Sequence, residues 1–164
     1  GVACGVTSTV TTSSADRWSG VPSSSTVTRP EREKARMTFS EEIQGMKILL
    51  VDDDESIRDS MKMFFLGEGL TIDTVETAEE GIEALAKQHY DIIITDSNLP
   101  GMDGLSFLKR IHDLCPGSFK ILMTTYLKDL PAAAAGLGVD ECIQKPFSAK
   151  IIRHSLTRFL EARR

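Results

Sequence analysis

Residues 47–55 read KILLVDDDE, a short apolar run that is followed by three consecutive aspartates and a glutamate. A second stretch, DIIITDSNLPGMDG at residues 91–104, has the same form, an apolar run followed by an acidic residue. Runs of this length, bounded by polar or turn residues, are typical of strands buried on both faces, as in parallel sheets. The two stretches therefore predict a buried sheet in an α/β protein.

On both sides of these stretches the periodicity alternates between strand-like and helix-like. Thr77 and Glu80 also have the pattern of a capping box at the start of a helix. The predicted strands are 47–51, 70–75, 91–95, 120–124 and 141–143, and the predicted helices are 55–67, 78–85, 105–115, 131–137 and 148–162. Parallel neighbours need right-handed helical crossovers that cover both faces, so we predict a doubly wound, mostly parallel, five-stranded sheet.

Composition excludes several classes of protein. The chain has 164 residues, a net charge of -5 and 26% charged residues, which fits one mildly acidic globular domain with residues left over. Because nucleic-acid-binding domains are usually basic, no direct nucleic-acid partner is expected. No apolar run approaches the roughly 18 residues of a membrane-spanning helix, so no membrane association is expected. Cys4, Cys115 and Cys142 lie far apart without a C-x-x-C, which fits a reducing, cytoplasmic location.

The first 40 residues differ in composition from the rest. Of the first 30 residues, 18 are Ser, Thr, Gly or Pro, and they show no apolar periodicity. Such a segment buries too little apolar surface to offset the entropy of ordering. We therefore predict a disordered or poorly ordered tail at residues 1–40 and a folded domain at 46–164. Whether this tail is native stays open, since translation could start at Met37 or at Met46.

In a doubly wound sheet, polar residues gather beyond the carboxyl ends of the strands, where ligands bind. The predicted strand ends carry Asp52, Asp53 and Asp54, then Asp96, Thr125 and Lys145. Crowded carboxylates repel one another unless a cation neutralises them, and oxygen donors without His or Cys favour Mg²⁺. Lys145 can offset part of the charge and bind a phosphoryl oxygen. Asp96 is then a candidate nucleophile that takes a phosphoryl group as an acyl phosphate.

Some of the acidic residues have a simpler interpretation. Asp54 and Glu55 are expected to cap the helix at 55–67 and to favour its positive end. Asp103 is expected to cap the helix that follows it, not to bind metal.

The ordered set of motifs resembles the receiver domains of two-component response regulators, in particular the single-domain chemotaxis regulator. The resemblance covers roughly residues 46–160 and rests on the residues 49–55, 91–104, Thr125 and 145–147. It implies a flavodoxin-like (βα)5 fold with strand order 2-1-3-4-5. It also implies that Asp96 is the phosphoacceptor for a sensor histidine kinase or phosphotransfer protein, and that the chain is no enzyme beyond its own phosphoryl uptake and loss.

The same resemblance implies a role for each site residue. The Mg²⁺ ligands would be Asp53, Asp96 and the backbone carbonyl of Asn98, with Asp52 acting through water. Thr125 would donate its hydroxyl to the phosphoryl group, Lys145 would pair with another phosphoryl oxygen, and the Lys145-Pro146 peptide would be cis.

Two positions depart from the family pattern. The resemblance implies that both take part in the conformational change that follows phosphorylation. Tyr126 follows Thr125 where the family usually has a small residue, and Cys142 stands at the aromatic position three residues before Lys145. We hypothesise that Tyr126 replaces the moving aromatic ring. The downstream protein target is expected on the face made by the fourth helix, fifth strand and fifth helix. Because the chain ends at Arg164, directly after the last helix, it is expected either to act by binding a protein or to be a receiver fragment of a larger regulator or hybrid kinase.

Two rival functions are considered. A Mg²⁺-dependent aspartyl phosphatase of the haloacid-dehalogenase type would use the D-x-D pattern of Asp52 to Asp54, but the chain lacks room for a cap and has Glu55 and Ser56 where that family has Thr or Val. The second rival is a receiver-like module that keeps the fold and acts only as a constitutive binding module. Such a module would not need the complete set of acidic residues. Both are therefore disfavoured.

Overall fold

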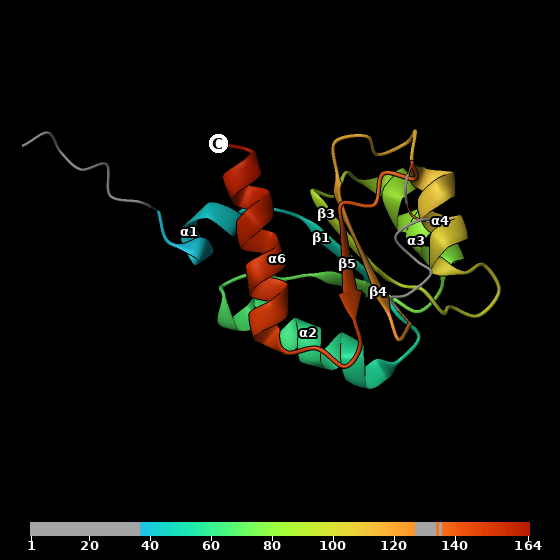
Figure 1. The fold of residues 1–164 in the computed structure, drawn as a ribbon, viewed down its shortest axis with the longest axis horizontal. Helices are drawn as coiled ribbons and strands as arrows, with labels where there is room; N and C mark the ends of the chain where they lie inside the picture. The colour runs from blue at the N-terminus through green and yellow to red at the C-terminus, as the bar shows by residue number, and fades with distance from the viewer. Residues whose placement is uncertain (1–36, 127–133, 135) are drawn as a thin grey trace, which may run out of the picture. The chain divides into compact units, whose positions relative to one another are not determined.

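The computed structural model describes residues 37–126, 134 and 136–164, and the statements below concern these residues. Five strands form one parallel sheet in the order β2-β1-β3-β4-β5. The strands are β1 (Ile48–Val51), β2 (Asp73–Val75), β3 (Ile92–Asp96), β4 (Phe119–Thr124) and β5 (Glu141–Gln144). The predicted α/β fold and its strand order are confirmed (Figure 1).

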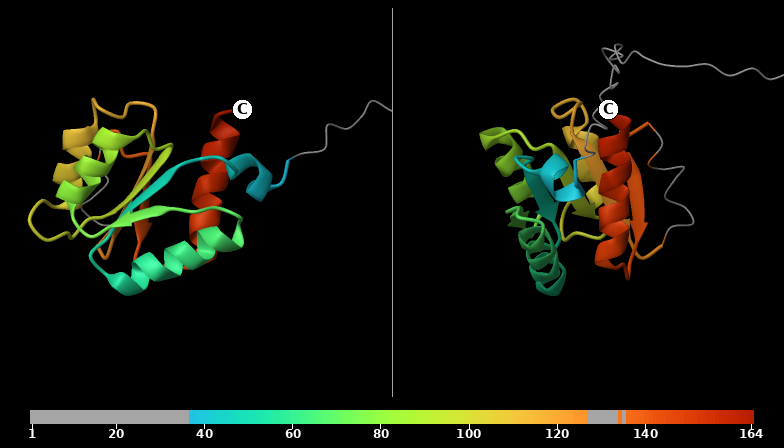
Figure 2. Two further views of the ribbon diagram at one scale, coloured as in Figure 1. Left: turned by 180° about the vertical axis from the view of Figure 1, so that it is seen from behind. Right: turned by 90° about the vertical axis from the view of Figure 1, so that its left-hand side faces the viewer.

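Helices cover both faces of the sheet, as Figures 1 and 2 show. Helices α2 (Glu55–Gly67) and α6 (Ala149–Ala162) lie on one face, and α3 (Ala78–Lys87) and α4 (Gly104–Ile111) on the other. Successive residues of β1 contribute to opposite cores, with Leu50 packed on the α2 and α6 side and Leu49 on the α3 and α4 side. This explains why β1 and β3 are apolar without alternation.

Side chains fix the starts of three of these helices. Asp54 accepts a hydrogen bond from the backbone N–H of Ser56, and Asp103 accepts one from Ser106. Thr77 and Glu80 form the predicted capping box at the start of α3. Each cap satisfies a backbone donor that the first helical turn leaves unpaired. The capping roles predicted for these residues are therefore confirmed.

Helix α1 (Phe39–Ile43) was not predicted. It begins within the last two residues of the segment 1–40, which was expected to be a disordered or poorly ordered tail. A helix of this length depends on tertiary packing, which the periodicity of its own residues does not reveal. Thr38 and Glu41 form a capping box at its start, and Ile43 is buried in the core beside α6.

One predicted strand is shorter in the structure, and one predicted helix is not tested by it. Strand β2 is shorter than the predicted run 70–75 and begins only at Asp73. Most of the helix predicted at 131–137 lies outside the described residues. Among the described residues, no helix is long and apolar enough to cross a membrane.

Three helices meet close to where the chain enters β1. Arg153 of α6 forms an ion pair with Glu68, which follows α2, and its guanidinium lies 4.9 Å from the centre of the Phe39 ring of α1. Ser40 donates a hydrogen bond of 2.7 Å to Glu68, and Arg164 forms an ion pair with Glu42. We call these residues the α1 junction: Phe39, Ser40, Glu42, Glu68, Arg153 and Arg164. The junction fastens α1 to α6, and Figure 1 shows the two helices side by side.

Candidate functional site

The parallel strands bring the predicted aspartates together. Asp52 directly follows β1 and Asp96 is the last residue of β3, and the pairing of Val51 with Thr95 makes them neighbours across the sheet. One carboxylate oxygen each of Asp52, Asp53 and Asp96 lie within 4.8 Å of one another. Asp52 and Asp96 are buried, whereas Asp53 is exposed. The cluster therefore has a buried side and a side open to solvent.

Lys145 joins the aspartates from the end of β5. Its Nζ donates a hydrogen bond of 2.9 Å to Asp52 and forms an ion pair of 3.2 Å with Asp96. Its backbone N–H donates to the carbonyl of Thr124, and the peptide to Pro146 is cis. We call Asp52, Asp53, Asp96 and Lys145 the acidic site.

Charge at the acidic site is not balanced. Three carboxyl groups face one ammonium group, so the fully ionised site has a formal excess of two negative charges. Burial raises the pKa of Asp52, and this outweighs the lowering by Lys145 and by the amide of Asp54. Burial alone would lower the pKa of Lys145, but its bond to Asp52 and the charges of Asp52 and Asp96 raise the pKa above its ordinary value. Lys145 is thus held as a cation, and the site favours a second one.

Asp52 is the most constrained of the three aspartates. Its backbone N–H donates to Val75, and its carbonyl accepts from Arg58 at 2.8 Å. One carboxylate oxygen accepts from the amide of Asp54 and the other from Lys145, each at 2.9 Å. Asp53 has no side-chain hydrogen bond or ion pair within the described part of the chain. Asp53 is therefore the carboxylate that is available to bind an incoming ion.

The other predicted residues follow the expected strands but are not joined to the aspartates by a hydrogen bond among the described residues. Asn98 lies exposed in the loop after β3, and Thr125 and Tyr126 lie exposed after β4. Cys142, on β5, is half-buried with a free thiol.

Sequence reasoning missed Thr124, the neighbour of Thr125. Thr124 is buried at the end of β4, where its hydroxyl accepts a hydrogen bond from the amide of Tyr126 at 3.1 Å and donates one to the carbonyl of Tyr126. The hydroxyl of Thr124 is thus already bonded, whereas no bond of the Thr125 hydroxyl occurs among the described residues.

Gly104 is a second residue whose role the sequence did not reveal. Its amide donates to the carbonyl of Ser97, so the first residue of α4 lies directly against the chain that leaves β3. A Cβ at this position would lie 1.9 Å from the carbonyl oxygen of Asp96. Only glycine allows this approach.

The donor set fits a hard divalent cation. Within the described ranges, the acidic site is the one cluster of three or more potential ligand side chains, and all its donors are carboxylate oxygens. Such donors, with the exposed Asp53 side open to water, suit Mg²⁺.

Comparison with known proteins identifies the same part of the chain. Residues 48–157 match the family model of the response regulator receiver domain. The DNA-binding transcriptional regulator NtrC of Escherichia coli (strain K12) is 40% identical over 102 residues, which are 61% of this chain and 22% of that protein. The C4-dicarboxylate transport transcriptional regulatory protein DctD of Rhizobium meliloti (strain 1021) is 34% identical over 119 residues, 71% of this chain and 26% of that protein. The chain thus spans about a quarter of the length of these curated relatives.

A solved structure agrees with these sequence matches. The crystal structure of a CheY-like response regulator receiver domain protein from Methanospirillum hungatei JF-1 superposes with a TM-score of 0.68 at 30% sequence identity. The superposition covers 71% of this chain and 94% of that one.

Proposed function

Because this chain belongs to the family of response regulator receiver domains, we propose that Asp96 accepts a phosphoryl group from the phosphohistidine of a sensor histidine kinase or phosphotransfer protein. The observation that carries the proposal is the acidic site itself, with three carboxylates within 4.8 Å of one another and Lys145 bridging two of them. Receiver domains act with histidine kinases, and the family generally binds Mg²⁺ at such an acidic pocket.

Bonding within the site favours Asp96 over Asp52 as the phosphoacceptor. Both oxygens of Asp52 and its backbone groups are already engaged, whereas the carboxylate of Asp96 has a single partner, Lys145, among the described residues. An oxygen of Asp96 attacks phosphorus, a P–O bond forms, and the P–N bond breaks with its electron pair left on the imidazole of the donor. The product is an aspartyl phosphate that water later hydrolyses.

The remaining site residues bind and orient the phosphoryl group. Lys145 Nζ already lies between Asp52 and Asp96, where it can pair with a phosphoryl oxygen. Asp53 and Asp96, the backbone carbonyl of Asn98, and Asp52 through water would hold Mg²⁺. When bound, this ion neutralises negative charge on the phosphoryl oxygens. No enzymatic turnover beyond uptake and loss of the phosphoryl group is proposed.

Thr125 is the proposed hydroxyl donor to the phosphoryl group, because the hydroxyl of the adjacent Thr124 is already bonded to Tyr126. We expect Thr125→Val to shorten the lifetime of the phosphorylated state or to lower its population. We expect Thr124→Val mainly to remove the hydrogen bonds that the Thr124 hydroxyl makes with the Tyr126 backbone. The reverse pattern would assign the role to Thr124.

Tyr126 and Cys142 are the proposed switch positions. Tyr126 is 80% exposed, and we propose that its ring moves when Thr125 engages the phosphoryl group. NMR spectra of Tyr126→Ala, with and without a phosphoryl mimic, test this movement. If the two states of the variant differ as much as those of the parent, Tyr126 is not the moving ring.

The decisive experiment is treatment with acetyl phosphate, or with BeF₃⁻, in the presence of Mg²⁺. With acetyl phosphate, the parent is expected to gain the mass of one phosphoryl group, and Asp96→Asn is expected to gain none. Asp59→Asn, which changes an exposed carboxylate on α2, is the matched control and should behave like the parent. Uptake by Asp96→Asn would refute the assignment. Steady turnover of p-nitrophenyl phosphate by the parent would instead favour the aspartyl phosphatase.

The biological setting is also a proposal. The match covers only 22% and 26% of the two curated relatives, which supports a receiver fragment of a larger regulator, with a hybrid kinase as the alternative. NtrC is named as DNA-binding, and we assign any nucleic-acid contact to segments other than the receiver domain. The output target is proposed to bind near β5 and α6, and the free thiols of Cys115 and Cys142 support a cytoplasmic location.

A further inference from the structure

Arg58 is a buried cation that the proposed reaction does not use. It lies in the second turn of α2, and its side chain is only 10% exposed. Nη1 donates a hydrogen bond of 2.8 Å to the backbone carbonyl of Asp52, and Nη2 donates one of 2.7 Å to Glu76. A guanidinium binds two acceptors at once in a fixed geometry, and Lys cannot reproduce this.

The contact with Asp52 is made to the main chain, not to the carboxylate. The carbonyl of Asp52 marks the point where β1 ends and the turn that carries Asp53 and Asp54 begins. Arg58 holds this turn from the side of α2, while Lys145 and the amide of Asp54 hold the carboxylate of Asp52. The position of the Asp53 side chain, which has no such contact of its own, depends on this turn.

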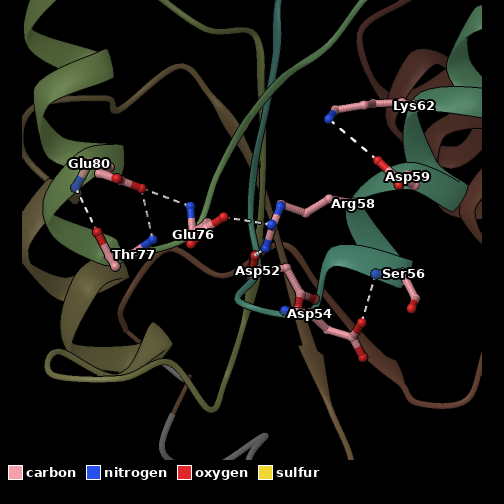
Figure 3. A network of polar contacts seen from close by, with 9 residues as sticks. All are labelled: Asp52, Asp54, Ser56, Arg58, Asp59, Lys62, Glu76, Thr77 and Glu80. Carbon is pink, nitrogen blue, oxygen red and sulfur yellow. Dashed lines mark hydrogen bonds and ion pairs between the residues drawn. The ribbon is translucent and has the colours of Figure 1, made fainter.

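The second acceptor connects Arg58 to another part of the fold. Glu76 directly follows β2, and its side chain is 65% exposed. Its own amide donates to Glu80, which also closes the capping box of α3 with Thr77. Figure 3 shows this series of contacts from Asp52 through Arg58 and Glu76 to Glu80. The turn after β1 is thereby fastened to the start of α3.

We propose that Arg58 is a positioning residue that holds the turn after Asp52 in the geometry needed for Mg²⁺ binding, with Glu76 as its outer anchor. The inference rests on the proposed function. Groups that orient metal ligands without touching the metal commonly change metal affinity about 10-fold or more when removed. Arg58 therefore affects the affinity for Mg²⁺ more than the rate of phosphoryl uptake once Mg²⁺ is saturating.

The test measures Mg²⁺ affinity directly, by NMR titration of backbone amides, in the parent and in Arg58→Met and Arg58→Lys. We expect the dissociation constant for Mg²⁺ to rise about 10-fold in Arg58→Met. A smaller rise is expected in Arg58→Lys, whose ammonium can reach only one of the two acceptors. The rate of uptake from acetyl phosphate at saturating Mg²⁺ should stay within about threefold of the parent, because the reacting groups are unchanged.

Two control variants distinguish a loss of positioning from a general loss of stability and from a change of charge. Ile111→Val shortens a buried side chain on α4 and should lower thermal stability without changing Mg²⁺ affinity. Glu76→Gln removes the charge of the outer anchor but keeps an oxygen acceptor for Arg58, so its Mg²⁺ affinity should stay close to that of the parent.

Each outcome decides one question. If the parent itself binds no Mg²⁺, the proposed function fails. If the parent binds Mg²⁺ and both Arg58 variants bind it within about twofold of the parent, the positioning role is refuted. Should Arg58→Met fail to fold, Arg58→Lys decides alone: weaker Mg²⁺ binding supports the role and parent-like binding refutes it.

Discussion

The acidic site and the α1 junction both bring charged groups together, but their charges are balanced differently. At the junction, Glu42 and Glu68 each have an arginine partner, so its formal charge is zero. At the acidic site, one ammonium serves three carboxylates. At the junction, the guanidinium of Arg153 also lies over the rings of Phe39 and Phe64, whereas Asp53 is exposed and has no such contact within the described residues.

This difference shows how one fold separates stability from binding. Charges that are matched inside the chain have no need of an external partner, and they hold helices together. Charges left unmatched at a buried site cost stability until a ligand of opposite charge arrives. The unmatched carboxylates, not the number of charged residues, mark the functional region. The predictions below test this contrast.

Removing Lys145 should have the largest effect on stability. Lys145→Met leaves Asp52 and Asp96 without their cation, and we expect it to lower the free energy of unfolding by about 3 kcal/mol in Mg²⁺-free buffer. Mg²⁺ should restore part of this loss, so its stabilising effect should be larger in the variant than in the parent. Denaturant unfolding with and without Mg²⁺ measures both quantities.

The matched control for Lys145 is Arg164→Met at the α1 junction. This ion pair is partly exposed, so its loss should cost less than about 1 kcal/mol and should not respond to Mg²⁺. An equal response to Mg²⁺ in both variants would remove the distinction between the two regions.

Gly104→Ala should have the next largest effect, because a methyl group would overlap the carbonyl oxygen of Asp96. We expect a loss of about 2 kcal/mol in the free energy of unfolding, together with slower phosphoryl uptake, since the backbone of Asp96 must shift. Thermal unfolding and uptake from acetyl phosphate measure the two effects. Gly67→Ala, at the end of α2 with open space around it, is the control and should gain about 0.5 kcal/mol. Parent-like uptake by Gly104→Ala would show that Asp96 tolerates the shift.

The smallest effect should appear at alkaline pH. The pKa of Lys145 is higher in the folded protein than its ordinary value, so its contribution to stability is complete below the unfolded pKa, about 10.4. This contribution is lost as the pH rises through the higher folded pKa. The difference in unfolding free energy between the parent and Lys145→Met should therefore be constant from about pH 8 to 10 and then shrink. A constant difference beyond that range would contradict the raised pKa.

Most of the fold was predictable because burial on both faces leaves a clear pattern in the chain. The apolar runs at residues 47–51 and 91–95 identified β1 and β3, and parallel pairing then placed Asp52, Asp96 and Lys145 at one edge of the sheet. The predicted ends of α2 were correct as well, since Asp54 caps its start.

The features that escaped prediction depend on contacts between distant residues. A charged residue such as Arg58 on a helix normally indicates a solvent-exposed face, and only the folded chain shows that it binds the Asp52 carbonyl. Thr124 and Thr125 are the same residue type in succession, so only the course of β4 distinguishes the buried hydroxyl from the exposed one. Helix α1 is too short for periodicity to reveal and depends on its contact with α6.

The ion pair between Glu42 and Arg164 has a practical consequence. It brings the two ends of the described domain next to each other, so residues 38–164 could be spliced into a surface loop of a carrier protein with entry and exit at a single point.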